Sequence, residues 1–199
     1  PGVTDKSTIW HANTQAPQWQ GKAEHQFDAG RIYGVQWRDW NGKHDQLLDL
    51  ITQIKTNPSS RRLMMTSWNP SELDQMCLPP CHVMCQFYVR NDKLSCQMYQ
   101  RSVDAFLGAP FNMASYSLLT HLIAQVCGLG LGEFIYTAGD VHVYNNHVEQ
   151  VKMQVSRNPY LLPTLTLNPA INDITKFTPN DCILENYQYH PPIQASMAV

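Results

Sequence analysis

The pattern that most constrains the fold is a pair of strand-like runs followed by a long apolar helix. Residues 82–89 and 94–101 are rich in strand-forming residues, and only the turn-forming segment 90–93 separates them. So short a connection predicts an antiparallel hairpin. Residues 112–126 are apolar nearly all round, which predicts a buried helix. Because a sheet and a helix bury their apolar faces against each other, we expect an α+β fold in which one sheet packs on a few helices.

The rest of the chain alternates between helix-like and strand-like segments. Leu47, Leu48, Ile51 and Ile54 recur at helical spacing within residues 45–56, which predicts a helix with these side chains on one face. A turn that contains a proline ends it. The remaining segments are predicted as a polar surface loop at 11–30, a strand at 133–144, an amphipathic helix at 146–157, and strands at 165–167 and 182–189.

Size and charge exclude several classes of protein. The 199 residues suit one domain with its own core, so we expect a single catalytic domain over residues 1–199. The formal net charge of −2 gives no general reason for nucleic-acid binding, and we expect no specific nucleic-acid partner. No apolar run approaches the roughly 20 residues that span a bilayer, and the first residues lack the pattern of a signal peptide. We therefore expect a soluble cytoplasmic protein with no membrane partner.

Six cysteines raise the questions of disulfides and metal binding. A chain of this length without a secretion signal favours reduced thiols. Cys77, Cys81 and Cys85 are spaced four apart, whereas zinc knuckles use two-residue gaps and a second Cys or His pair. We expect no bound metal.

Cys81 is the candidate nucleophile. It follows two prolines in the run LPPCH at 78–82, so a stiff backbone leads into its strand. A thiolate nucleophile requires nearby positive charge to lower its pKa, and hairpin pairing is expected to bring Arg101 toward the strand of Cys81. The alternative interpretation is that Cys81 is a small buried apolar residue.

Three further groups have both a functional and a structural interpretation. Arg61 and Arg62 suit a phosphate, because each presents a bidentate fork, but they also fit a solvated basic pair. Asn112 can meet the adjacent N–H and carbonyl of a uracil ring, but it also fits a helix N-cap. His142 and Tyr144 alternate on one strand face, where they either line a cavity or are satisfied buried polar groups.

Taken together and in this order, the motifs resemble those of the thymidylate synthases. The matching segments run from about Thr8 to the last residue. They include SRR (60–62), SWNP (67–70), LPPCH (78–82), CQFYV (85–89), LSCQ (94–97), YQRS (99–102), FLG (106–108), PFN (110–112), ASY (114–116), and GD with His142 and Tyr144 after it. The resemblance implies a mixed β-sheet packed against helices and a homodimer joined sheet to sheet. It also implies reductive methylation of dUMP to dTMP, with 5,10-methylenetetrahydrofolate as the co-substrate and dihydrofolate as the second product.

The resemblance further implies roles for individual residues. Cys81 would attack C6 of the pyrimidine, Arg101 would keep the thiol ionised, and Tyr33 would help the C5 proton to leave. Asn112 and His82 complete the implied catalytic group. The residues implied to bind dUMP are Arg61 and Arg62 (across a dimer interface), Gln100, Arg101, Ser102, Asp104, Asn112, His142 and Tyr144.

The implied folate site combines one acid with apolar residues. Asp104 would anchor the pterin ring. Trp10 would help to exclude water, and Val199 would close the site as a movable tail. The residues implied to pack around the folate are Ile9, Trp10, Leu107, Gly108, Phe111 and Ala198.

Two departures from the family pattern bear on these roles. The family has a further N-terminal stretch with an arginine loop and a catalytic glutamate. The match here begins in mid-pattern at Pro1, so we expect the chain to lack that segment and to be a fragment of a longer one. The second departure is His11, which stands where an acid is usual, in a segment that carries its own polar insert.

Two rival functions remain as alternatives. One is a dUMP or dCMP hydroxymethylase of the same fold, which runs the same addition but finishes with water in place of hydride. Asn112 argues against a cytosine substrate, and Trp10 favours methylation. The other rival is a catalytically inactive binding homologue.

Overall fold

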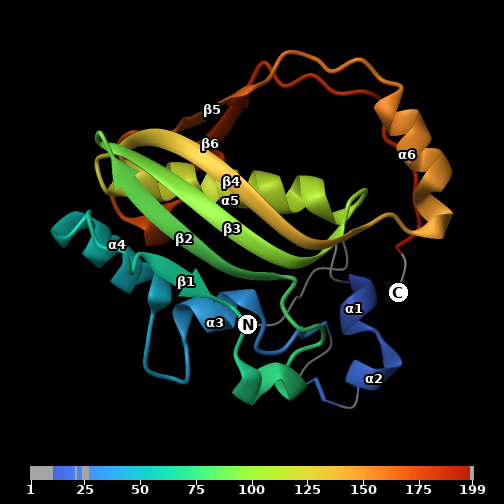
Figure 1. Cartoon of the computed structure of the whole chain (residues 1–199), viewed down its shortest axis with the longest axis horizontal. Coiled ribbons are helices and arrows are strands. Elements are labelled where there is room, and N and C mark those ends of the chain that lie inside the picture. The colour runs from blue at the N-terminus through green and yellow to red at the C-terminus, as the bar shows by residue number, and fades with distance from the viewer. Residues whose placement is uncertain (1–10, 21, 24–26, 198–199) are drawn as a thin grey trace.

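A four-stranded mixed sheet forms the centre of the molecule (Figure 1). The computed structural model describes residues 11–20, 22–23 and 27–197. The strands lie in the order β1 (Met64–Thr66), β2 (His82–Arg90), β3 (Lys93–Asp104) and β4 (Gly130–His142). The first three pair antiparallel, whereas β3 and β4 pair parallel. The expectation of a mixed sheet packed against helices is confirmed.

The β2–β3 hairpin has the predicted turn. Asn91 and Asp92 have positive φ angles of 51° and 55°, as the two-residue turn that matches the twist of a hairpin requires. Cys85 and Phe87 point into the core, whereas Tyr88 is 59% exposed. Because side chains alternate along a strand, the sheet has one face on the core and one open face.

Helix α5 (Gly108–Val126) crosses the core face between β3 and β4 (Figure 1). It begins four residues before the predicted start, after a turn in which Asp104 Oδ1 accepts the backbone N–H of Phe106 and of Leu107. Within the predicted range 112–126, Tyr116 and Ile123 are buried, whereas Met113 is 42% exposed. The prediction of a helix buried all round is therefore wrong. The apolar side chains of α5 face two places, the sheet and a cavity beside the first turns of the helix.

Helix α4 (Gln46–Thr56) confirms the predicted helix, with one correction to its buried face. Asp45 caps it, because its Oδ1 accepts the backbone N–H of Leu48 at 3.0 Å. The side chain of Leu48 is exposed, and Leu50 is buried in its place. Residues at i, i+3, i+4 and i+7 share one helix face, so the face that starts at Leu47 includes Leu50 and excludes Leu48. The buried residues are Leu47, Leu50, Ile51 and Ile54.

The segment 11–30 is more ordered than the predicted surface loop. It contains the short helices α1 (His11–Thr14) and α2 (Pro17–Gln20). Trp19 is buried, and its Nε1 donates to the carbonyl oxygen of Asp28 at 2.6 Å. The polar composition of this segment led to the prediction of a loop. The next helices along the chain are α3 (Tyr33–Arg38) and, after α4, the 3-10 helix η1 (Pro70–Gln75).

The C-terminal part is an extended arm (orange to red in Figure 1). After η2 (Asn145–His147) and α6 (Val148–Val155) it forms an antiparallel pair, β5 (Thr164–Leu167) with β6 (Cys182–Glu185). The 3-10 helices η3 (Ile174–Lys176) and η4 (Pro179–Asp181) lie between these strands. The predicted strand 182–189 ends early, where Asn186 takes a positive φ of 58°. α6 buries no residue, so the predicted amphipathic helix does not pack by an apolar face.

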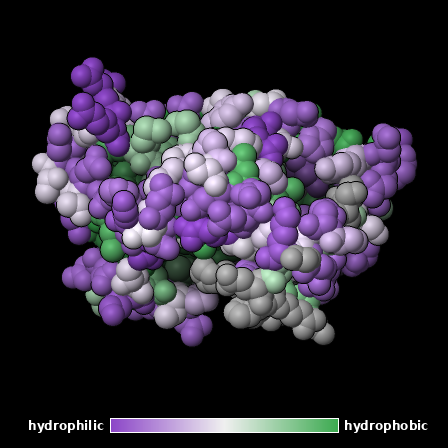
Figure 2. All heavy atoms as spheres, turned by 90° about the horizontal axis from the view of Figure 1, so that it is seen from below, coloured by the Kyte–Doolittle hydropathy of each residue, from purple (hydrophilic) through white to green (hydrophobic). Residues whose placement is uncertain are grey.

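The described surface carries few signals of other functions. From the side of α3 and α4 it is mostly hydrophilic, with scattered apolar patches (Figure 2). Among the described residues, no helix is long and apolar enough to cross a bilayer, and no cluster of His, Cys, Asp and Glu is arranged for a metal ion. All six cysteines are free thiols.

Candidate functional site

A cavity of about 350 Å³ lies where β2 begins, β3 and β4 end and α5 starts. A cavity of this size can enclose a small-molecule ligand. Its lining brings together residues from both ends of the described chain. They are Asn13, Tyr33, Leu78, Cys81, His82, Gln100, Ser102, Asp104, Leu107, Gly108, Phe111, Asn112, His142, Tyr144, Ala195 and Met197.

Cys81 stands at the bend immediately before β2, with its thiol half-buried at the cavity. The backbone N–H of Arg101 donates to the Cys81 carbonyl oxygen at 2.8 Å, so the predicted pairing of these two residues is confirmed. Burial raises the pKa of the Cys81 thiol above its ordinary value, although the Arg101 charge and a hydrogen bond from Tyr33 both act to lower that pKa. The thiolate is therefore supported by two neighbours but opposed by its burial.

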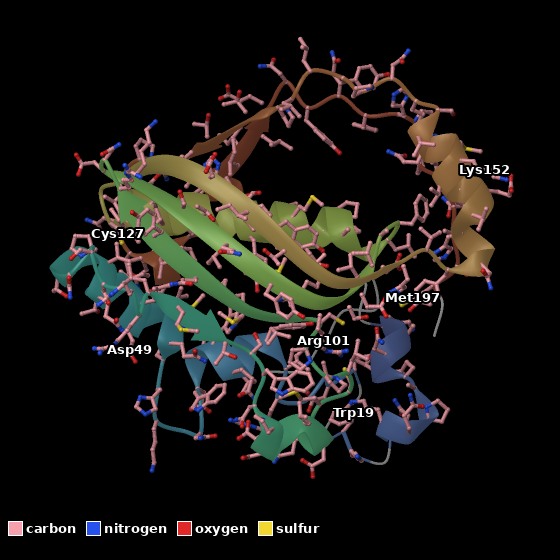
Figure 3. All side chains as sticks on the ribbon, viewed as in Figure 1. Trp19, Asp49, Arg101, Cys127, Lys152 and Met197 are labelled. Atoms are coloured by element: carbon pink, nitrogen blue, oxygen red, sulfur yellow. The ribbon has the colours of Figure 1, made fainter. Side chains whose placement is uncertain are left out.

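Arg101 holds the Pro-Pro turn rather than lining the cavity. Its Nε donates to the carbonyl oxygen of Pro80 and its Nη2 to that of Pro79, both at 2.9 Å. Its guanidinium also lies 5.4 Å from the ring centre of Trp68, within range of a cation–π contact. The side chain lies beneath the sheet, on the side of the N-terminal helices (Figure 3). Arg101 thus fixes the backbone that presents Cys81.

Tyr33 and His82 form a stacked pair beside the thiol. Their ring centres are 3.7 Å apart with planes only 7° from parallel. The Tyr33 hydroxyl oxygen accepts the backbone N–H of Cys81 at 2.8 Å, and His82 Nδ1 is 2.8 Å from the hydroxyl of Tyr116. Burial lowers the pKa of His82 to about 3 and raises that of Tyr33 well above its usual range. Both groups are therefore neutral at physiological pH.

Two side-chain amides and one hydroxyl form a chain of hydrogen bonds from the cavity to β4. Gln100 Nε2 donates to Asn112 Oδ1 at 3.1 Å, and the hydroxyl of Tyr136 donates to Gln100 Oε1 at 2.8 Å. Asn112 lies four residues inside α5, whose N-cap position is Leu107. The interpretation of Asn112 as a helix cap is therefore wrong, and its amide belongs to the cavity.

The wall on the side of α5 is apolar except for one acid. Leu107, Gly108 and Phe111 line it, and Phe111 is more than half exposed. Gly108 lies close to Asp104 and Asn112, because a Cβ there would be 3.4 Å from the Asp104 Cβ and 3.8 Å from Asn112 Oδ1. The two backbone bonds to Asp104 both use Oδ1, so no described residue occupies its Oδ2. A flat ligand with a polar edge fits such a surface.

The opposite wall comes from the end of β4 and the C-terminal tail. His142 Nδ1 is 3.1 Å from Asp140 Oδ1, and its ring meets that of Tyr144 edge-on at 5.0 Å. The tail contributes Ala195 and Met197, and Met197 lies near α1 in Figure 3. These residues put an imidazole, a phenol and a thioether at the cavity mouth.

Not every predicted site residue reaches this cavity. Arg61 and Arg62 are exposed in the turn before β1 and do not line it. Ile9, Trp10 and Ala198, together with Val199, lie outside the described residues. The remaining predicted residues line the cavity, except Arg101, which acts through the Pro-Pro turn.

A larger groove of about 900 Å³ lies beside α2 and α3, but it has fewer side chains suited to catalysis. Its three cationic side chains already have partners. Arg31 pairs with Glu72 at 2.8 Å, Arg38 pairs with Asp45 at 2.8 Å, and Lys22 reaches the carbonyl oxygen of Asp74 at 3.4 Å. The described lining of this groove contains no cysteine to act as a nucleophile.

Several residues of the site were not identified from the sequence. Tyr116 and Tyr136 hold His82 and Gln100, respectively, and Leu78 and Met197 line the cavity. Strand alternation could have placed Tyr136 on the core face beside Met98, its register partner on β3. No local signal marks Met197, because its position depends on the path of the C-terminal arm.

The cavity can therefore hold a planar ring with an N–H and a carbonyl edge, attack it with a thiol, and stack a second flat molecule against Phe111. Comparison with known protein families gives a match to the family model described as thymidylate synthase, over residues 3–199. The matched region includes every residue that lines the cavity. The chain belongs to the thymidylate synthase family.

Proposed function

We propose that the protein catalyses the reductive methylation of dUMP to dTMP, with 5,10-methylenetetrahydrofolate as the co-substrate and dihydrofolate as the second product. The observation that carries this proposal is the position of Cys81 and Asn112 on one cavity, next to the apolar wall of α5. This reaction requires a nucleophile that attacks the pyrimidine ring and an amide that forms hydrogen bonds with uracil. The adjoining apolar wall offers a surface on which a pterin can stack, and its acid offers a hydrogen-bond acceptor.

The residues of the nucleotide side have distinct tasks. Cys81 Sγ adds to C6 of the pyrimidine, which makes C5 nucleophilic. Asn112 meets the N3–H and O4 of uracil, and Ser102, His142 and Tyr144 bind the phosphate and the ribose. Because Tyr33 keeps its proton, it acts on the C5 proton through hydrogen bonding and not as a phenolate base. His82 and Tyr33 also form a rigid stacked floor next to the sulfur.

The residues of the folate side fit the second substrate. Phe111 offers an exposed ring for stacking, Gly108 adds no side chain to the wall, and Asp104 Oδ2 can accept from the pterin. When bound there, 5,10-methylenetetrahydrofolate supplies the one-carbon unit and the hydride. The tail residues Ala195 and Met197 then cover the cavity and exclude water, which would otherwise yield a hydroxymethyl product.

A twofold dimer completes the proposed site. The open face of the sheet presents exposed apolar side chains, namely Met64, Tyr88, Tyr99 and Ile135. Exposed apolar surface of this kind suits a partner subunit. Arg61 and Arg62 do not reach their own cavity, and in such a dimer they would bind the phosphate in the partner's site. We place this composite site in one catalytic domain that spans residues 1–199.

Two experiments test these proposals. Incubation with dUMP and 5,10-methylenetetrahydrofolate should give dTMP and dihydrofolate, identified by mass and by the absorbance of dihydrofolate. Formation of 5-hydroxymethyl-dUMP would instead assign the hydroxymethylase reaction, and binding without turnover would assign an inactive homologue. For the dimer, mixing inactive Cys81→Ser protein with inactive Arg61→Glu protein should restore activity. Absence of recovery after verified subunit exchange would refute the composite site.

A further inference from the structure

A chain of hydrogen bonds runs behind the cavity from β4 to α5. The hydroxyl of Tyr136 donates to Gln100 Oε1 at 2.8 Å. Gln100 Nε2 donates to two acceptors, the carbonyl oxygen of Ser102 at 2.9 Å and Asn112 Oδ1 at 3.1 Å. Gln100 is only 2% exposed, so water cannot replace these partners.

The carbonyl oxygen of Ser102 fixes the direction of this chain. A backbone carbonyl only accepts, so the amide of Gln100 must turn its nitrogen toward Ser102. Both Nε2 hydrogens are then used, and Oε1 is left to accept from Tyr136. The reversed amide would set two oxygens against each other in a buried place.

The orientation of the Gln100 amide determines the orientation of the Asn112 amide. Because Gln100 donates to Asn112 Oδ1, the Asn112 amide is held with its Nδ2 group on the other side. Within the described part of the chain Asn112 Nδ2 has no hydrogen-bond partner, and Asn112 lines the cavity. The cavity therefore meets a ligand with an oriented N–H donor and the remaining lone pair of Oδ1.

We propose that Tyr136 is a positioning residue that, through Gln100, orients the Asn112 amide and so makes the cavity select a 4-oxo pyrimidine over a 4-amino pyrimidine. This inference rests on the proposed function, which supplies the pyrimidine nucleotide. The Asn112 Nδ2 donor meets O4 of uracil, whereas the 4-amino group of cytosine would set donor against donor.

The Tyr136 hydroxyl is suited to donate. Burial raises its pKa above the ordinary value for tyrosine, and the nearby Cys81 raises that pKa further. Without this hydroxyl, Gln100 Oε1 would be buried without a donor. Gln100 would then shift toward another donor for Oε1, and Asn112 would lose the short Nε2 bond that holds its amide in one orientation. With the amide free to turn over, its Oδ1 meets the cytosine amino group.

The test compares the dissociation constants of dUMP and dCMP by calorimetry, which does not depend on turnover. Tyr136→Phe keeps the ring and removes only the hydroxyl. It should weaken dUMP binding and lower the dUMP-over-dCMP preference about tenfold, as expected when a buried hydrogen-bond partner is removed. Gln100→Met breaks the same chain from the other end and should give a fall at least as large.

Two control variants separate positioning from a general structural effect. Thr120→Val removes a buried hydroxyl that bonds the Tyr116 carbonyl, and Tyr160→Phe removes an exposed hydroxyl of the C-terminal arm. Neither should change the preference. In an Asn112→Asp background, adding Tyr136→Phe should have no further effect, because the amide to be oriented is gone.

The outcomes distinguish this inference from the proposed function. If the wild type prefers dUMP and folded Tyr136→Phe and Gln100→Met keep that preference, the positioning role is wrong and the proposed function stands. Independent, additive effects of Tyr136→Phe and Asn112→Asp would also overturn the role. If the wild type binds neither nucleotide, the proposed function fails and this inference fails with it.

Discussion

The two walls of the cavity differ in how the protein supports them. Cys81 stands immediately before β2, Gln100 on β3 and Asn112 on α5, and these elements enclose the hydrophobic core. Every buried apolar side chain of the described residues lies at or before Val126. The other wall comes from the end of β4 and from the C-terminal tail. Among the described residues after Val126, His147 is the one that is buried. The wall with Cys81 and Asn112 is therefore held in place by the hydrophobic core. The wall with the C-terminal tail is held by polar contacts.

Two polar contacts that hold the tail share one acceptor atom. His147 Nε2 lies 2.7 Å from the carbonyl oxygen of Ser196, and Asn146 Nδ2 donates to the same oxygen at 3.3 Å. A net hydrogen bond contributes only about 1 kcal/mol, whereas a fully buried core side chain contributes several times more. A wall held by such contacts can open and close at small cost, and a packed wall cannot.

The largest expected effect concerns the nucleophile of the packed wall. Cys81→Ser should lower turnover roughly a thousandfold or more, because an alcohol is a far weaker nucleophile than a thiolate. Cys127→Ala, at the far end of α5, should keep most of the activity. Steady-state rates of dTMP formation check both variants. A Cys81→Ser enzyme with a near-normal rate would rule out covalent catalysis at this position.

The next effect compares the stability of the two regions. Met98→Ala removes a fully buried side chain of β3 and should lower the free energy of unfolding by about 2–5 kcal/mol. Leu162→Ala, at a side chain 90% exposed in the arm, should change it by less than about 0.5 kcal/mol. Urea titration followed by circular dichroism measures both. Equal losses would show that the arm carries a core of its own.

A pH titration tests the packed wall at His82. Burial holds the folded pKa of His82 near 3, against 6.5 for the unfolded chain. The unfolded state therefore binds the extra proton first, and stability present above pH 6.5 is lost as the pH falls toward 3. In His82→Asn this loss is absent, so the stability advantage of the wild type should shrink by about 2–3 kcal/mol between pH 7 and pH 4. Urea titrations at both pH values give the comparison, and a constant difference would mean that His82 is not held neutral.

The smallest effect concerns the arm. His147→Phe keeps a ring between Phe106 and Tyr144 but removes the bond to the Ser196 carbonyl oxygen. Loss of about 1 kcal/mol should raise the KM for 5,10-methylenetetrahydrofolate roughly fivefold. The dissociation constant of dUMP should change less, because Cys81 and Asn112 stay in place and the ring at position 147 still contacts Tyr144. A matching loss of dUMP affinity would contradict the separation of the two walls.

Much of the packed region could be predicted from local patterns. The hairpin, α4 and the pairing of Arg101 with the strand of Cys81 follow from residue spacing and turn composition. The errors lie where a segment has two different neighbours. α5 faces both the sheet and the cavity, so its apolar composition did not predict which residues are exposed.

The arm was predicted less well because its segments lack a buried face. α6 buries no residue, and β6 ends four residues before the predicted boundary. Hydrophobic periodicity predicts structure only where one face is buried. The polar segment 11–30 gave the opposite error, because the two large side chains of Trp19 and Phe27 are buried in it.

The sequence by itself determined the chemical groups and the family, because strand alternation, turn residues and motif order are properties of neighbouring positions. Tertiary structure alone decided which groups meet. Gln100 and Tyr136 are 36 residues apart, and they touch only because α5 carries the chain back to a parallel strand. The register of that parallel pair, and the return of the tail to His147, depend on contacts between distant segments. No local pattern contains those contacts, so the hydrogen-bond chain behind Asn112 could be seen only in the folded protein.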